Sequence, residues 1–112
     1  LSTSGAASHI AITQATGPLS WSSISTSSDL TVTAEKIALG QTTVEGNLLS
    51  ITTGTGSAGG VTQTGPVVVK GDAHFVADTG TDQDAVLLAS NDFRGVLSFN
   101  KVNGGSWRHA SV

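Results

Sequence analysis

The stretch that decides the fold is GGVTQTGPVVVKGDAHFV, residues 59–76, in which short apolar runs flank a Gly-Pro and a Gly-Asp corner. Its second half, VVVKGDAHFV (67–76), repeats the pattern of TTVEGNLLSI (42–51) position by position. We expect residues that share a place in this pattern to stack on one another. The same offset aligns the following pairs: Val44 with Val69, Gly46 with Gly71, Asn47 with Asp72, Ile51 with Val76, and Val61 with Val86.

Two further echoes extend the pattern along the chain. The segment VTQTGPVVV (61–69) resembles ITQATGPLSW (12–21), and HFVADTGTDQDAVLL (74–88) resembles DLTVTAEKIAL (29–39). Repeats of about 20–30 residues that contain three short strands are typical of a parallel β-solenoid, whose stacked coils share one core. We therefore predict an all-β solenoid of about four to five coils, with a β-sandwich as the alternative fold.

The strands are expected wherever β-branched and other apolar residues form short runs between Gly, Asn, Asp, Ser or Pro. The helix-like stretches 33–40 and 82–90 are too short for isolated helices and are interpreted as strands. Corners are expected at Gly65-Pro66, Gly71-Asp72 and Asn91-Asp92, with Phe93 packing inward, and corner glycines are expected to supply positive φ. The predicted strands are His9–Thr13, Leu19–Ile24, Leu30–Ala34, Lys36–Leu39, Thr42–Val44, Leu48–Thr52, Gly60–Thr64, Val67–Lys70, His74–Ala77, Ala85–Ala89 and Val96–Phe99.

Composition limits the classes of function. The 112 residues include 15 Ser, 15 Thr and 14 Gly, only 12% are charged, and the formal net charge is −3. Five scattered Lys and Arg residues form no phosphate-binding stripe, so we expect neither nucleic acid nor an anionic membrane surface as a partner. Cysteine is absent, which excludes disulfides and thiolate chemistry. Without an apolar run of about 18 residues, no membrane insertion is expected. We interpret the chain as one solenoid segment of a longer repeat protein.

Three phrases carry a family resemblance: SDLTVTAEKIAL (28–39), GGVTQTGPVVVKGDAHFVAD (59–78) and VLLASNDFRGVLSF (86–99). Together they resemble the repeats of filamentous-haemagglutinin-like bacterial exoproteins over most of residues 10–100. The resemblance implies a right-handed parallel β-helix, a secreted or bacterial cell-surface location, and a role in adhesion or matrix building. It implies no catalytic residues. The chain departs from the repeats at Trp21, at the short turn Glu35-Lys36, and in the tail 101–112, which is interpreted as a cap or contact segment.

No catalytic, cofactor-binding or metal-binding residue is predicted. His9, His74 and His109 lack the spacing of a zinc site, and His74 is expected to face solvent while Phe75 packs inward. Serine, histidine and aspartate occur without a nucleophile elbow, so no hydrolase is indicated. Four acids, Asp78, Asp82, Asp84 and Asp92, fall within Asp78–Asp92, but DTGTDQD (78–84) matches no calcium motif closely and is interpreted as a solvated turn, with a weak surface cation as the alternative.

The remaining candidates concern surfaces. Thr31-Val32-Thr33 and Thr62-Gln63-Thr64 are interpreted as exposed strand faces and not as one regular threonine array. Trp21 and Trp107 are left open between a stacking surface for a sugar or partner and a plug for a coil end.

Taken together, we expect a non-enzymatic structural or adhesive module of a secreted or cell-surface exoprotein. Its expected partners are a host or neighbouring cell surface, a glycan or matrix. The alternative is a fibre or sheath subunit whose copies stack end to end, because open strand edges favour such growth. A polysaccharide-acting β-helix enzyme is the least favoured hypothesis.

Overall fold

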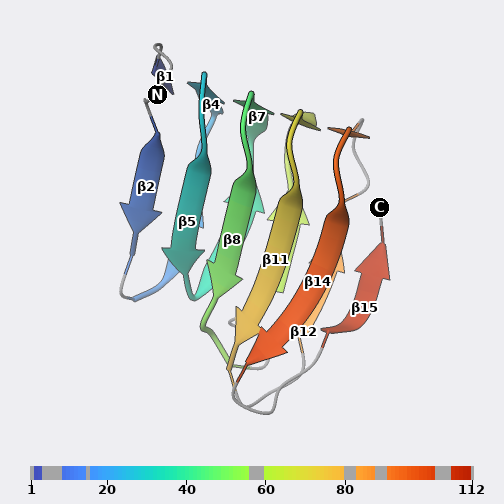
Figure 1. The fold of residues 1–112 in the computed structure, drawn as a ribbon. Helices are drawn as coiled ribbons and strands as arrows, with labels where there is room; N and C mark the ends of the chain where they lie inside the picture. Colours follow the sequence, from blue (N-terminus) through green and yellow to red (C-terminus); the bar gives the residue numbers. More distant parts are fainter. Residues whose placement is uncertain are drawn as a thin grey trace.

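The protein folds into three parallel β-sheets, which the chain visits in turn (Figure 1). The computed structural model describes residues 2–3, 9–14, 16–55, 60–79, 83–87, 91–102 and 107–111. Sheet A contains β1 (Ser2–Thr3), β4 (Ser23–Thr26), β7 (Gln41–Val44), β10 (Val67–Val69) and β13 (Asn91–Phe93). Sheet B contains β2 (Ile10–Thr13), β5 (Leu30–Ala34), β8 (Leu48–Thr52), β11 (Ala73–Asp78) and β14 (Leu97–Val102). Sheet C contains β3 (Pro18–Ser20), β6 (Lys36–Leu39), β9 (Gly60–Gln63), β12 (Gln83–Val86) and β15 (Trp107–Ser111).

Each strand pairs with the strand three elements further along the chain, as a parallel solenoid requires. The paired residues confirm the predicted stacking of Val44 with Val69 and of Ile51 with Val76. The chain is therefore an all-β parallel solenoid of about four to five coils, and the sandwich alternative is wrong. Helices are absent from the described residues, so none there is long and apolar enough to cross a membrane.

The core is a set of side-chain rows that run along the solenoid. In sheet B, alternate residues point inward, because side chains of a strand alternate between its two faces. One inward row contains Leu30, Leu48 and Ala73, all fully buried or nearly so. The next contains Val32, Ser50 and Phe75, which are fully buried. Phe75 stacks on Phe99 with ring centroids 5.3 Å apart, and Phe93 meets it edge-on at 6.4 Å.

Several predicted strand limits were wrong. The expected strand Leu19–Ile24 is two strands, β3 and β4, because the chain turns from sheet C to sheet A at Trp21 and Ser22. Asn91 and Asp92 belong to β13 and form no corner. Of the expected strand Ala85–Ala89, β12 ends at Val86, and residues 88–89 lie outside the described part.

Two of the sequence alignments also require correction. Val61 pairs with Ala85 and not with Val86. The two Gly-Pro echoes occupy different places in the coil, because Pro18 begins a strand of sheet C whereas Pro66 precedes a strand of sheet A. Gly-Pro suits any tight corner, so its recurrence does not mark one position of a repeat.

Coil length varies along the chain. Leu30 pairs with Leu48, and Leu48 pairs in turn with Ala73. The coil from Leu48 to Ala73 is therefore longer than the coil from Leu30 to Leu48. Most of the difference lies in the corner between sheets B and C, which is Glu35 alone after β5 but residues 53–59 after β8. From β4 onward, the corner between sheets A and B has three residues in each of four successive coils.

Candidate functional site

From β4 onward, the corner between sheets A and B has a constant length and carries the most regular polar structure of the solenoid. It consists of residues 27–29, 45–47, 70–72 and 94–96 in successive coils. Its third position is Asp29, Asn47 and Asp72, and then Val96 in the last coil. We call Asp29, Asn47 and Asp72 the Asx ladder.

Each member of the Asx ladder accepts a hydrogen bond from the backbone of the next coil. Asp29 Oδ1 accepts from the amide of Asn47 at 2.8 Å, and Asn47 Oδ1 accepts from the amide of Asp72 at 2.8 Å. Asp72 Oδ1 accepts from the amide of Val96 at 2.9 Å. These bonds satisfy corner amides that the sheets do not pair. The chain of acceptors ends at Val96, since a valine side chain cannot accept a hydrogen bond.

The middle position of this corner needs glycine for space. A Cβ atom on Gly71 would lie 2.3 Å from Asn47 Oδ1 and 2.5 Å from the carbonyl oxygen of Gly46. The expectation that these glycines supply positive φ was wrong, because in the described part only Gly17 and Gly60 have it. The corner glycines instead allow one coil to approach the backbone of the coil before it.

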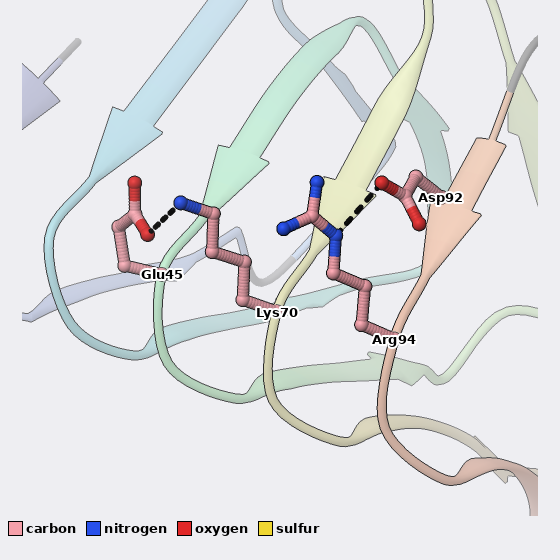
Figure 2. A network of polar contacts seen from close by, with 4 residues as sticks. All are labelled: Glu45, Lys70, Asp92 and Arg94. Atoms are coloured by element: carbon pink, nitrogen blue, oxygen red, sulfur yellow. Dashed lines mark hydrogen bonds and ion pairs between the residues drawn. The ribbon is translucent and has the colours of Figure 1, made fainter.

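In three of the four corners the first position, Glu45, Lys70 or Arg94, carries charge on the outside of the solenoid. Figure 2 shows Lys70 reaching back to Glu45 of the preceding coil, with Nζ and Oε2 2.6 Å apart. Arg94 turns instead to Asp92 of its own coil, at 2.8 Å between Nε and Oδ2. The four side chains of these two ion pairs are 41–54% exposed. Ion pairs this exposed balance charge at the surface but contribute little to the free energy of unfolding.

The outer face of sheet B is the best candidate for a binding surface. Leu49, Ile51 and Val76 form a half-buried apolar centre on it. The surrounding positions are hydroxyl, amide, alanine and histidine side chains, with one acid, Asp78, at the end of β11. We call these eleven residues the sheet B outer face: Ala11, Thr13, Thr31, Thr33, Leu49, Ile51, His74, Val76, Asp78, Ser98 and Asn100. A surface with a single charge at its edge suits an uncharged partner with hydroxyl groups.

His9 and His74, which the sequence analysis did not expect to share a zinc site, lie apart in the structure. Phe75 is fully buried and His74 lies on the sheet B outer face, as predicted, where its Nδ1 is hydrogen-bonded to Ser98 Oγ. His9 precedes β2, and β5 and β8 lie between β2 and β11, so three strand spacings of roughly 4.8 Å separate His9 from His74. The side chain of His109 lies outside the described part.

The acids between residues 78 and 92 do not gather into a site among the described residues. Asp92 pairs with Arg94, Asp78 and Asp84 each have an interaction partner, and Asp82 lies outside the described residues. No three or more His, Cys, Asp or Glu residues in the described part come together in a way that could hold a metal ion.

Trp21 lies in the corner between sheets C and A and packs against the core there. Its Nε1 donates to the buried hydroxyl of Thr42 at 3.0 Å, and its ring packs against the core. The side chain of Trp107 lies outside the described part. Further along, Gln63 and Asn91 hydrogen-bond through their side-chain amides, and Asn91 Nδ2 also donates to the carbonyl of Leu87 at 2.9 Å.

Sequence reasoning missed two parts of this arrangement. Asp29 was not aligned with Asn47 and Asp72, although each precedes an apolar residue that opens a strand, in Asp29-Leu30, Asn47-Leu48 and Asp72-Ala73. That dipeptide pattern could have revealed the Asx ladder. The pairing of Gln63 with Asn91 carries no sequence pattern of its own. The two threonine pairs form no single array, as predicted, because Thr31 and Thr33 lie on sheet B and Thr62 lies on sheet C. Thr31, Thr33 and Thr62 are half-buried and not fully exposed as expected, and Thr64 follows the end of β9.

Comparison with known proteins identifies the chain as a repeat protein. A family model described as repeats of unknown function (DUF5649) matches residues 27–100, and the chain belongs to this family. The match begins in the corner between β4 and β5 and ends within β14, so it covers the part in which the Asx ladder is built. No curated protein and no solved structure matches the chain significantly.

Proposed function

We propose that this member of the repeat family is a rod-forming module of a bacterial secreted or cell-surface exoprotein, similar to the filamentous-haemagglutinin-like adhesins. The observation that supports the proposal most is the register of the coils. Every described strand pairs in parallel with its counterpart in a neighbouring coil, and the Asx ladder repeats this contact at a corner that keeps three residues from β4 onward. A structure of this kind holds surfaces at fixed spacing along an axis.

The sheet B outer face is the surface that the rod presents. Its apolar centre, Leu49, Ile51 and Val76, can pack against the apolar face of a sugar ring, while Thr31 and Thr33 can hydrogen-bond to hydroxyl groups. Glu45, Lys70 and Arg94 at the first position of the neighbouring corner are already held in ion pairs. We infer that the partner is a glycan or matrix component of a host or neighbouring cell surface, bound weakly at each module and strongly by many modules together.

The proposal includes no enzymatic activity and no cofactor. The sheet B outer face carries one histidine, whose Nδ1 is hydrogen-bonded to the hydroxyl of Ser98. Among the described residues no third group is hydrogen-bonded to this imidazole, whereas the serine–histidine catalytic arrangement uses one to orient the ring. The corners supply paired charges and side-chain acceptors for backbone amides, which suit a scaffold.

Adhesion is tested with the purified chain on a glycan array and on immobilised matrix proteins. We expect binding that Leu49→Asp reduces at least tenfold, because the carboxylate places a charge in the apolar centre. Thr43→Asp is the matched control, since Thr43 lies on the outer face of sheet A and its substitution adds the same charge. Equal loss in both variants, or no binding by the wild-type chain to any ligand, would overturn the adhesive role.

The proposed location has a separate test. Antibodies against the chain are applied to intact and to permeabilised cells of the producing organism, and the culture medium is probed in parallel. We expect labelling of intact cells or protein in the medium. Labelling that requires permeabilisation, with none in the medium, would contradict an extracellular location.

A further inference from the structure

His74 lies at the boundary between the apolar centre and the polar part of the sheet B outer face. In its row it pairs with Leu49 of β8 on one side and with Ser98 of β14 on the other, and Val76 is the next outward residue on β11. None of these three neighbours is charged. Asp72, two residues before His74, belongs to the corner and directs Oδ1 to a backbone amide of the next coil. A ligand on this face therefore meets the imidazole among uncharged side chains.

The two ring nitrogens of His74 differ in their environment. Nδ1 is hydrogen-bonded to Ser98 Oγ. Nε2, which is further from the backbone, has no hydrogen-bond partner among the described residues, and it is not buried, since Ser50 Oγ is the one buried side-chain polar atom there without a partner. In a neutral imidazole one nitrogen donates and the other accepts. In either tautomer, Nε2 is therefore the nitrogen that remains available to a ligand.

The bond to Ser98 gives Nε2 a defined direction. β11 and β14 are paired from Ala73 to Asp78, so the two strands hold His74 and Ser98 side by side. A planar ring that is held at Nδ1 presents Nε2 in one direction, whereas the hydroxyl groups of threonines on this face can rotate to suit a ligand. A fixed polar group discriminates between ligands, because a ligand without the matching group leaves it unpaired.

We propose that Nε2 of His74 selects the glycan by hydrogen bonding to one hydroxyl of a neutral sugar ring that lies on the apolar centre. Leu49 of that centre is one strand spacing, roughly 4.8 Å, from His74, so a ring on Leu49 brings the hydroxyls of its rim to the imidazole. A sugar hydroxyl can both donate and accept, and it therefore matches either tautomer. Ser98 is a positioning residue, because it acts through the imidazole. The inference rests on the proposed adhesive function and adds to it the side chain that sets selectivity.

The test compares two substitutions that each retain one half of the hydrogen-bonding capacity of the imidazole. The amide of His74→Gln reaches the position of Nε2, whereas the amide of His74→Asn reaches only that of Nδ1. The probe is an array of neutral oligosaccharides, followed by calorimetric titration with the preferred oligosaccharide and with each of its monodeoxy forms.

We expect one monodeoxy form to bind the wild-type chain about three- to tenfold more weakly than the parent glycan, which is the net value of one hydrogen bond. His74→Asn should weaken binding of the parent glycan by the same factor and should no longer distinguish it from that monodeoxy form, because the two changes remove the same bond. His74→Gln should retain the discrimination.

The positioning role of Ser98 has its own pair of variants. Ser98→Ala removes the partner of Nδ1 and leaves Nε2 in place, so discrimination against the monodeoxy form should fall toward that of His74→Asn. Ser98→Thr keeps the hydroxyl and should restore the discrimination. Equal discrimination in Ser98→Ala and in the wild type would show that Ser98 does not position the ring.

The outcomes separate this inference from the adhesive function. A folded His74→Asn that still discriminates against the same monodeoxy form, or that weakens all glycans uniformly, would overturn the inference. The adhesive function would stand if Leu49→Asp still reduces binding. A wild-type chain that binds no glycan overturns both. Circular dichroism checks the fold, and His74→Thr, which suits a strand and also lacks a group at the position of Nε2, replaces His74→Asn if that variant loses its sheet spectrum.

Discussion

Replacing Gly71 with alanine tests whether close approach of the coils at the sheet A–sheet B corner limits the choice of residue. The new Cβ would lie 2.3 Å from Asn47 Oδ1 and 2.5 Å from the carbonyl oxygen of Gly46. The Asn47 side chain can rotate away, but the Gly46 backbone cannot, so the corner must shift. The shift strains two bonds, from Gly71 N to Gly46 O at 2.9 Å and from Asp72 N to Asn47 Oδ1 at 2.8 Å.

The free energy of unfolding should fall by about 3 kcal/mol. Two weakened hydrogen bonds contribute about 1 kcal/mol each, and overpacking against backbone adds about 1–3 kcal/mol. The smaller unfolded-state entropy of alanine offsets about 0.4–1 kcal/mol of this loss. In urea unfolding followed by circular dichroism, with a slope of about 2 kcal/mol/M, the midpoint should fall by roughly 1.5 M.

The matched control is Ser28→Ala, because Ser28 occupies the same corner position in an earlier coil and already carries a Cβ there. We expect its free energy of unfolding to change by less than about 0.5 kcal/mol, as surface substitutions usually do. A Gly71→Ala midpoint that falls no further than that of Ser28→Ala would refute the steric argument. In that case the absence of a Cβ atom would not be the reason for glycine at this corner position.

Three further outcomes are expected in the same unfolding assay. Ser50→Ala should raise the free energy of unfolding by about 1 kcal/mol, because Ser50 Oγ is buried without a hydrogen-bond partner among the described residues; a loss of stability would contradict this. A double-mutant cycle of Glu45→Ala and Lys70→Ala should give a coupling energy of about 0.5 kcal/mol that shrinks at high salt, whereas a salt-independent coupling above about 1.5 kcal/mol would indicate a desolvated pair. Trp21→Phe should lower stability by about 1 kcal/mol through loss of the hydrogen bond to Thr42, and an unchanged midpoint would show that this bond contributes nothing.

The stacking of the coils could be predicted from sequence where local pattern and coil length agree. Val44 pairs with Val69, and Ile51 pairs with Val76. The two residues of each pair are separated by the same number of residues, so one sequence offset aligns both pairs. Strand side chains alternate with a period of two, so a slip by one residue would turn each buried row outward. That constraint also separates Phe75, which must point inward, from His74, which lies on the outer face.

The errors have a common physical origin. Corner chemistry is local, so Gly17-Pro18 and Gly65-Pro66 look alike although they lead to different sheets. Coil length is not local, and the change in length between successive coils hides the alignment of Asp29 with Asn47. The acceptors of the Asx ladder were missed for this reason, since their partners are amides in the next coil.

The two corners that flank sheet B differ in function: one fixes the register between coils, and the other accommodates changes in coil length. From β4 onward, the sheet A–sheet B corner keeps three residues, with a glycine in most coils and, in three of the four corners, a side-chain acceptor that reaches the next backbone, so it fixes the register. The corner between sheets B and C ranges from Glu35 alone to residues 53–59, yet the strands on both sides stay paired in parallel. Register is therefore set on one side of sheet B, and length can change on the other at little cost, because loop closure depends only weakly on loop length. Insertions that give one repeat a new surface should be tolerated between sheets B and C, and the same insertions in the Asx ladder corner should disrupt the stack.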